Sequence, residues 1–172
     1  MRKEIRIAGF GGQGIVLSGF ILGQAALLDG NNAVQSQSYG PEARGGAAKS
    51  EVIISDEKID YPRVTEADVF IAMSQEAYDK LQGDLKEKGL ILIDKDLVEA
   101  SGKAIKGIPF TSTADKLGKK IVANVVMLGA LTAMTGIVSK EAIMNAIKAN
   151  VPKKAVEINI KAFEKGYKLG GG

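Results

Sequence analysis

The fold of this chain is decided by the stretch Gly9-Phe10-Gly11-Gly12-Gln13-Gly14. It follows a short apolar segment at residues 5–8, which predicts a strand, and it opens a long apolar segment at residues 15–28, which predicts a helix. Glycines adopt backbone angles that other residues resist, and they leave no Cβ between a ligand and the backbone. The first N–H groups of a helix have no partner inside it, and the helix dipole is positive there. The stretch therefore predicts a site for a phosphate or carboxylate group.

The three glycines Gly9, Gly11 and Gly14 fit the pattern G-x-G-x-x-G of dinucleotide-binding turns. In those folds an acidic residue ends the second strand, about 20 residues further on, and binds the ribose. Here the second predicted strand, residues 33–38, ends without an acid, and Asp29 lies before it in a turn. An ordinary NAD site is therefore disfavoured. A tight turn that only lets helix and strand pack closely remains an alternative to the anion site.

Composition narrows the classes of function. A chain of 172 residues suits one domain with a sizeable core. Its net charge of +3 and its 5% of aromatic residues argue against a nucleic-acid surface. The chain has no Cys and no His, so it lacks thiolates for an iron–sulfur cluster and the commonest general base and metal ligand. We therefore predict no catalytic residue and no metal ligand, and we favour a binding domain or a subunit over a self-contained enzyme.

Two uncharged segments approach the length of a membrane span, residues 7–28 and 121–138. Glycines and polar side chains interrupt both, so we expect buried helices and no membrane association. Arg2 and Lys3 precede an apolar segment, but Glu4 and the glycines break the pattern of a signal peptide. The absence of Cys is compatible with a cytoplasmic location.

Strands and helices are expected to alternate along the chain. The strands are predicted at residues 4–8, 33–38, 48–55, 68–72, 89–93 and 104–110, with a short return strand at residues 58–61 that closes a β-hairpin. The helices are predicted at residues 14–28, 75–87, 114–117, 119–135, 140–149 and 153–167. Ser74 and Ser139 are expected to cap helices, and Gly136 to end one. This pattern predicts an α/β fold: a single Rossmann-like domain with a mainly parallel sheet flanked by helices.

A second loop follows the second predicted strand and reads Ser38-Tyr39-Gly40-Pro41-Glu42-Ala43-Arg44-Gly45-Gly46. One interpretation is an ordinary surface loop with a local ion pair between Glu42 and Arg44. The other is a binding loop, in which Arg44 and the N–H groups of the two last glycines contact a phosphate or carboxylate. In a βαβ arrangement this loop and the glycine turn leave the carboxyl ends of their strands. Both would then face the crevice in which open parallel sheets bind ligands.

Asn124 is the one strongly polar side chain of the predicted helix at residues 119–135. It is either a buried amide that is satisfied within the fold or a contact to a ligand or partner subunit. Further on, apolar residues recur at helical spacing in the last predicted helix and indicate core packing.

In these two loops the chain resembles the gamma subunit, or gamma domain, of the 2-oxoacid:ferredoxin oxidoreductases. The same resemblance is carried by Asn124 with Leu128-Gly129-Ala130-Leu131, by residues 155–159, by Ala162-Phe163 and by Gly166. It spans essentially the whole chain. It implies a gamma-type catalytic domain of the pyruvate/2-oxoacid ferredoxin oxidoreductases at residues 1–168, followed by a flexible tail at residues 169–172.

The resemblance implies a subunit of an enzyme that oxidatively decarboxylates a 2-oxoacid, joins the acyl group to coenzyme A and reduces ferredoxin. Thiamine diphosphate, Mg and iron–sulfur clusters are implied on partner chains, namely alpha and beta subunits and a ferredoxin-like subunit. The gamma domain is implied to cap the active site and to help bind coenzyme A. We expect 2-oxoglutarate as the substrate, with pyruvate and branched-chain or aromatic oxoacids left open.

The residues that we expect to contact coenzyme A come from the two loops and the apolar helix. They are Gly9, Gly11, Gly12, Gln13, Gly14, Ser38, Tyr39, Gly40, Glu42, Arg44, Gly45, Gly46 and Asn124. Coenzyme A carries a diphosphate and a further phosphate, so an anion-binding turn and an arginine suit it together.

Two alternatives remain beside this hypothesis. One is a free-standing Rossmann-type nucleotide-binding reductase, which the missing acid and the missing His disfavour. The other is a purely structural subunit whose glycines serve packing. We also hypothesise that the isolated chain forms a homodimer through an apolar surface that partner subunits normally cover.

Overall fold

A single sheet organises the protein, with strands in the order β2-β3-β1-β4-β5-β6. The computed structural model describes residues 1–38 and 47–172. Within them the strands are β1 (Arg2–Phe10), β2 (Asn32–Gln37), β3 (Ala47–Ser55), β4 (Ala67–Ala72), β5 (Leu85–Asp94) and β6 (Ile105–Ile108). On one side of β1 the chain first forms β2 at the edge of the sheet and then β3 beside β1, whereas on the other side it moves outward through β4, β5 and β6. The sheet therefore changes its winding direction between β1 and β4.

The sheet is parallel except at one strand. β1 pairs in parallel with β4, β4 with β5, and β5 with β6, whereas β3 is antiparallel to both of its neighbours, β1 and β2. β2 therefore runs in the same direction as β1, and its carboxyl end lies at the same edge of the sheet. The prediction of a mainly parallel sheet is confirmed, and β3 is its reversed member.

The predicted return strand at residues 58–61 is not formed. β3 is paired along both of its edges, by β1 and by β2, so it has no free edge for a return strand to join. Among the described residues the antiparallel pairs are those of β3 with β1 and with β2.

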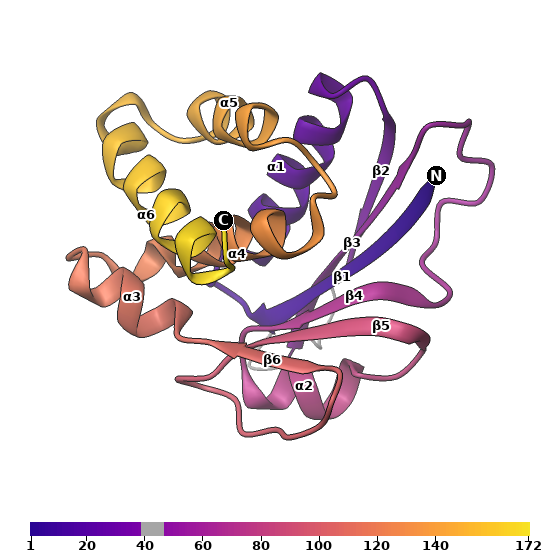
Figure 1. The fold of residues 1–172 in the computed structure, drawn as a ribbon, viewed down its shortest axis with the longest axis horizontal. Helices are drawn as coiled ribbons and strands as arrows, with labels where there is room; N and C mark the ends of the chain where they lie inside the picture. The colour runs from indigo at the N-terminus through magenta and orange to yellow at the C-terminus, as the bar shows by residue number, and fades with distance from the viewer. Residues whose placement is uncertain (39–46) are drawn as a thin grey trace.

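The helices cover the two faces of the sheet unequally, as Figure 1 shows. α1 (Ile15–Leu28), α4 (Ala123–Thr135), α5 (Lys140–Asn150) and α6 (Val156–Leu169) gather on one face, and α2 (Gln75–Leu81) lies against the other. α3 (Phe110–Lys116) and two short 3-10 turns, η2 (Lys120–Val122) and η3 (Lys153–Ala155), connect these elements. The layer of four helices encloses the main core.

Alternation along the strands assigns each side chain to one of these layers. Ile5 and Ile7 of β1 belong to the main core beneath α1 and α4. Ala8, the next residue after Ile7, belongs instead to a smaller cluster with Phe70 and Ala77 of α2. The face that carries α2 therefore has less apolar cover than the face that carries the four helices.

The structure confirms the predicted caps. Ser74 Oγ accepts a hydrogen bond from Ala77 N at 3.2 Å, and Ser139 Oγ accepts one from Ala142 N at 3.1 Å. Gly136 follows α4 with a left-handed φ of 59°. These three residues begin or end their helices as the sequence pattern indicated.

Three predicted boundaries were wrong. The helix predicted at residues 114–117 begins at Phe110 as α3, because β6 already ends at Ile108. The helix predicted at residues 75–87 ends at Leu81, because Asp84 adopts a left-handed φ of 59° and its carbonyl accepts a hydrogen bond from Ala67 N at 2.8 Å. That bond draws the chain into β5, which begins at Leu85 instead of at residue 89. The helix predicted at residues 119–135 starts as the 3-10 turn η2 before α4 begins.

α4 and α6 cross at backbone contact. A Cβ placed on Gly129 would overlap the carbonyl oxygen of Phe163, and a Cβ on Gly166 would overlap that of Val126. Glycine is therefore required on both helices for this distance of approach. On α1 a Cβ placed on Gly19 would overlap Ser50 Oγ of β3, so glycine lets this side chain lie against the helix.

Gly166→Ala is expected to force α4 and α6 apart and to lower the free energy of unfolding by about 3 kcal/mol. The gain in helix propensity, at most about 1 kcal/mol, is too small to offset this overlap. Urea denaturation measures the difference. Gly83→Ala is the matched control, because a Cβ there has no neighbour within 4 Å and φ is not in the left-handed region. Equal stability of the two variants would contradict the proposed packing.

Candidate functional site

The glycine turn joins β1 to α1 and has the geometry that its sequence predicts. Gly12 and Gly14 have φ values of 93° and 72°, in the left-handed region that favours glycine. Gln13 N donates to Phe10 O at 3.2 Å and closes the turn. Gly14 immediately precedes the first residue of α1, and no side chain caps that helix end. The N–H groups of the first turn of α1 are therefore available to an anionic group.

The side chain of Gln13 holds the turn against the neighbouring strand. Its Oε1 accepts from Phe10 N at 2.6 Å, and its Nε2 donates to Met73 O at 2.9 Å. Phe10 ends β1, whereas Met73 follows β4. Gln13 therefore fixes the separation of the two strand ends at the point where the sheet changes its winding direction.

Asn124 lies behind the turn. Its side chain is only 4% exposed, and its Nδ2 donates to Gly14 O at 3.3 Å. A Cβ on Gly14 would overlap this amide, so the glycine serves the contact as well as the left-handed φ. The structure thus places Asn124 as a buried amide that positions the turn, while its contact to a ligand or partner stays a prediction.

A cleft of about 290 Å³ opens beside the turn at the carboxyl ends of β1 and β4. Its lining comes from the turn, from the segments that follow β4 and β5, from α3, and from η2 with the start of α4. The lining residues are Gly12, Gln13, Met73, Leu97, Thr111, Lys120, Ile121 and Ala123. Open parallel sheets bind ligands at this topological position. Gly12 and Gln13 are the two cleft residues that the sequence analysis had singled out.

Lys120 is the basic side chain that lines this cleft, and the sequence analysis missed it. It starts the η2 turn that leads into α4. A cation at the start of a helix opposes the helix dipole, so Lys119-Lys120 before an apolar helix was a signal that could have been noticed. The lysine adds a positive charge to the N–H groups of the turn, and the two together suit a phosphate group.

Asp94 organises the opposite wall of the cleft. It ends β5, is fully buried, and its Oδ2 accepts from Thr111 Oγ1 at 2.5 Å and from Thr111 N at 3.2 Å. Its Oδ1 accepts from Phe110 N at 3.2 Å and from Asp96 N at 3.1 Å. Burial raises the pKa of Asp94 above its ordinary value, although the hydrogen bond from the Thr111 hydroxyl opposes this shift. Asp94 is a positioning residue that fixes Thr111 at the cleft.

Most of the predicted second loop lies outside the described residues. This holds for Tyr39, Gly40, Glu42, Arg44, Gly45 and Gly46. Of its ends, Ser38 N donates to Lys49 O at 3.1 Å, and Ala47 is the register partner of Phe10. Both ends of the loop therefore lie at the edge of the sheet that carries the glycine turn, as the predicted strand directions require.

The structure does not support the interpretation of the glycine turn as a dinucleotide-binding site. β2 ends at Gln37, so no acidic side chain ends the second strand. Asp29 instead follows α1 and accepts from Ser139 N and Ser139 Oγ, both at 2.6 Å. The acid that lay near the right distance in sequence therefore connects α1 to the start of α5.

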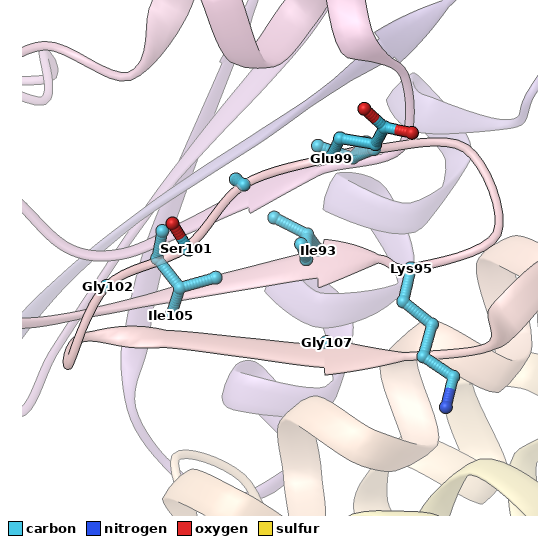
Figure 2. A pocket seen from close by; sticks show the side chains of 9 residues that line it. Ile93, Lys95, Glu99, Ser101, Gly102, Ile105 and Gly107 are labelled. Carbon is cyan, nitrogen blue, oxygen red and sulfur yellow. The ribbon is translucent and has the colours of Figure 1, made fainter.

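A second hollow of about 650 Å³ lies between β5, β6 and the loop that joins them, and Figure 2 shows it from close by. Ile93 and Ile105 form part of its lining, whereas the charged ends of Lys95 and Glu99 point away from each other. Ligand sites have polar groups that converge on one point. The cleft at the glycine turn is therefore the stronger candidate site.

The described parts of the chain contain neither a metal-binding cluster nor a membrane span. Among residues 1–38 and 47–172, no group of three His, Cys, Asp or Glu side chains could hold a metal ion. None of the helices in these ranges is long and apolar enough to cross a bilayer.

Comparison with protein families and curated proteins gives matches along nearly the whole chain. The family described as pyruvate ferredoxin/flavodoxin oxidoreductase matches residues 4–169. The chain is 56% identical to 2-oxoglutarate synthase subunit KorC from Methanocaldococcus jannaschii, over 98% of this chain and 94% of that protein.

Two solved structures share the fold. The gamma subunit of a keto/oxoacid ferredoxin oxidoreductase from Geobacter sulfurreducens has a TM-score of 0.90 and 48% identity, and the match covers 99% of this chain and 97% of that one. The 2-oxoglutarate:ferredoxin oxidoreductase from Magnetococcus marinus, with 2-oxoglutarate, coenzyme A and succinyl-CoA bound, has a TM-score of 0.88 and 27% identity. That match covers 99% of this chain but 31% of the other.

Gln13→Ala is expected to lower the free energy of unfolding by about 2 kcal/mol, because it removes two hydrogen bonds to backbone groups. Urea denaturation is the measurement. Gln82→Ala serves as the control, since Gln82 is exposed and has no side-chain hydrogen bond within the described residues. If Gln13→Ala lowers the free energy of unfolding no more than Gln82→Ala does, Gln13 does not hold the turn.

The Asp94→Asn variant is expected to reveal the raised pKa of Asp94. An acid with a raised folded-state pKa contributes stability that is present below its unfolded pKa and is lost as pH rises through the folded pKa. The free energy of unfolding of the wild-type chain, minus that of the variant, should therefore fall between about pH 4 and about pH 7. Urea denaturation at both pH values measures this difference, and an increase with pH would contradict the prediction.

Proposed function

Because the chain belongs to the pyruvate ferredoxin/flavodoxin oxidoreductase family, we propose that it is the gamma subunit of a multi-subunit 2-oxoglutarate:ferredoxin oxidoreductase. The assignment of 2-oxoglutarate as the substrate rests on the 56% identity, over 98% of the chain, to a 2-oxoglutarate synthase subunit. In this reaction 2-oxoglutarate is oxidatively decarboxylated, its acyl group is joined to coenzyme A as succinyl-CoA, and the electrons pass to ferredoxin.

The chemical steps belong to partner subunits in this proposal. Thiamine diphosphate with Mg serves as the electron sink for decarboxylation, and iron–sulfur clusters carry the electrons. The chain has no Cys and no His, so its own residues do not fit an iron–sulfur cluster. We assign these groups to alpha and beta subunits and to a ferredoxin-like subunit, in a cytoplasmic complex.

This chain contributes binding and exclusion of water. The free N–H groups of the glycine turn and the Lys120 ammonium provide positive charge for a phosphate of coenzyme A. Gln13 and Asn124 hold the turn from two sides through hydrogen bonds to Met73 O and Gly14 O. The apolar lining of the cleft, with Met73, Leu97 and Ile121, would keep water from reactive intermediates when partner subunits close over it.

The outer surface of α1 supports the role as a subunit. Leu17, Phe20, Leu27 and Leu28 are exposed by 37%, 52%, 57% and 56%, although a helix that is apolar on all sides is normally buried. Phe20 and Leu27 also line an apolar groove of about 360 Å³ between α1 and β2. In the Magnetococcus marinus enzyme the matching region is 31% of a longer chain. We propose that the subunit equivalent to the rest of that chain covers α1.

The substrate is tested on the complex purified from its own organism. Ferredoxin reduction should show a kcat/KM at least about tenfold higher for 2-oxoglutarate than for pyruvate, 2-oxoisovalerate or indolepyruvate, which corresponds to about 1.4 kcal/mol of transition-state stabilisation. A preference for another oxoacid would contradict the assignment of substrate but not the assignment to the family.

Phe20→Glu is expected to weaken binding to the larger subunits at least tenfold, because it would bury an unpaired carboxylate at about 2 kcal/mol or more. Co-purification and size-exclusion chromatography of the assembled complex measure the loss. Tyr61→Glu is the matched control, with a side chain that is 55% exposed outside α1. If the complex with Phe20→Glu stays intact, the subunit contacts lie elsewhere.

A further inference from the structure

The outer face of α6 carries a row of lysines. Lys161, Lys165 and Lys168 follow one another at spacings of four and three residues, and Lys154 lies seven residues before Lys161 in the turn η3. At 3.6 residues per turn, these four side chains project within about 60° of one another. The buried residues of α6 lie on its other side, against α4, whereas all four lysines are exposed. We call these four residues the lysine face.

Most of the charge on the lysine face has no counter-charge within the chain. Lys161 Nζ lies 2.7 Å from Glu157 Oε1 and is thereby paired. Lys154, Lys165 and Lys168 have neither an ion pair nor a hydrogen bond among residues 1–38 and 47–172. Together η3 and α6 contain five lysines and two glutamates, which gives this segment a net charge of +3.

The lysine face belongs to a basic half of the chain. Residues 95–172 contain 13 basic and 6 acidic residues, a net charge of +7, whereas residues 1–94 contain 10 basic and 14 acidic residues, a net charge of −4. α3 and η2 pack against α6, as Figure 1 shows for α3, and they add the exposed Lys116 and the neighbouring Lys119. A charge distribution this uneven orients a charged partner before contact. It attracts a negatively charged partner to the side of α3 and α6.

The lysine face suits a different kind of contact from the apolar face of α1. On α6, which the structure describes in full, Leu169 is the exposed large apolar side chain, whereas α1 exposes four. Permanent interfaces are apolar at their centre and poor in lysine, because lysine is a strongly hydrated charge on a flexible stem. Charged surfaces instead accelerate brief encounters, and electron-transfer partners associate through small interfaces of this kind.

An iron–sulfur electron carrier has the charge that the lysine face attracts. Its cluster is held by Cys thiolates, and four thiolates give the cluster a net negative charge that reduction increases further. In the proposed reaction the electrons pass to such a carrier, ferredoxin. This chain has no Cys and therefore no cluster of its own, so a docked ferredoxin must also reach the subunit that holds the donor cluster. The lysine face then forms one side of the docking site.

We propose that the lysine face docks the ferredoxin that accepts electrons from the assembled enzyme, and that the cluster-bearing subunit completes the docking site. The choice of ferredoxin rests on the proposed function, whereas the preference for a negatively charged protein rests on the lysines. In this role the lysines raise the rate of encounter and lower the KM for ferredoxin. They do not take part in oxidation of the oxoacid.

The test reverses two charges of the lysine face in the assembled complex, with the double variant Lys154→Glu/Lys165→Glu. At low ionic strength, kcat/KM for the organism's own ferredoxin should fall at least about tenfold through a higher KM. The rate with methyl viologen, a small cationic acceptor, should stay unchanged. Lys88→Glu/Lys103→Glu is the matched control, because it makes the same change in net charge at two exposed lysines outside α6. The control should keep the wild-type KM for ferredoxin.

Ionic strength gives a second readout. For the wild-type complex, kcat/KM for ferredoxin should fall as KCl is added, and this dependence should be weaker in the Lys154→Glu/Lys165→Glu variant. If this variant and the control share the same KM and the same salt dependence, the proposal is overturned. If the variant complex loses a subunit in size-exclusion chromatography, the lysines hold a permanent partner and ferredoxin docking is overturned. If the wild-type complex reduces neither acceptor with any oxoacid, the proposed function itself fails.

Discussion

The carbonyl oxygen of Gly14 is the point on which the rest of the structure depends. It accepts hydrogen bonds from Ser18 N at 2.9 Å, from Ser18 Oγ at 2.8 Å and from Asn124 Nδ2 at 3.3 Å. The first two bonds start α1, and the third connects it to α4, 110 residues away. Because the φ of Gly14 is left-handed and Asn124 leaves no room for a Cβ, only glycine satisfies both conditions here. The turn, two helices and the cleft are thereby fixed together.

Glycines also set the packing distances of α1, α4 and α6 in the helical layer. Gly19 lets α1 lie against the Ser50 side chain of β3, and Gly129 with Gly166 brings the backbones of α4 and α6 into contact. The side of α1 that faces away from this packing exposes Phe20 and Leu27. An exposed apolar face of this kind marks a surface for a partner protein. The fold therefore presents a cleft at the glycine turn and an exposed apolar surface on α1.

Sequence patterns predicted the parts of the fold that depend on neighbouring residues. The strand–turn–helix at Gly14, the caps at Ser74 and Ser139, and the helix end at Gly136 are all local, and the structure confirms them. The direction of β3 depends on its pairing partners, and the early end of α2 depends on a bond from Ala67 N to Asp84 O, so neither could be derived from spacing. Only the glycine-turn part of the cleft was predicted, because Lys120 and Thr111 reach it from segments distant in the sequence. Arg6 and Glu51, 45 residues apart, gave no sequence signal of the buried hydrogen bond that Arg6 Nε donates to Glu51 Oε1.

Mass, composition and cofactor content of the native assembly test the central claim most directly. The tagged chain, purified from its own organism, would be measured by native mass spectrometry. A subunit of a 2-oxoacid:ferredoxin oxidoreductase should emerge with larger chains that carry thiamine diphosphate and iron–sulfur clusters. A chain that emerges alone, with or without a bound nucleotide, would contradict the account and would favour a free-standing nucleotide-binding protein.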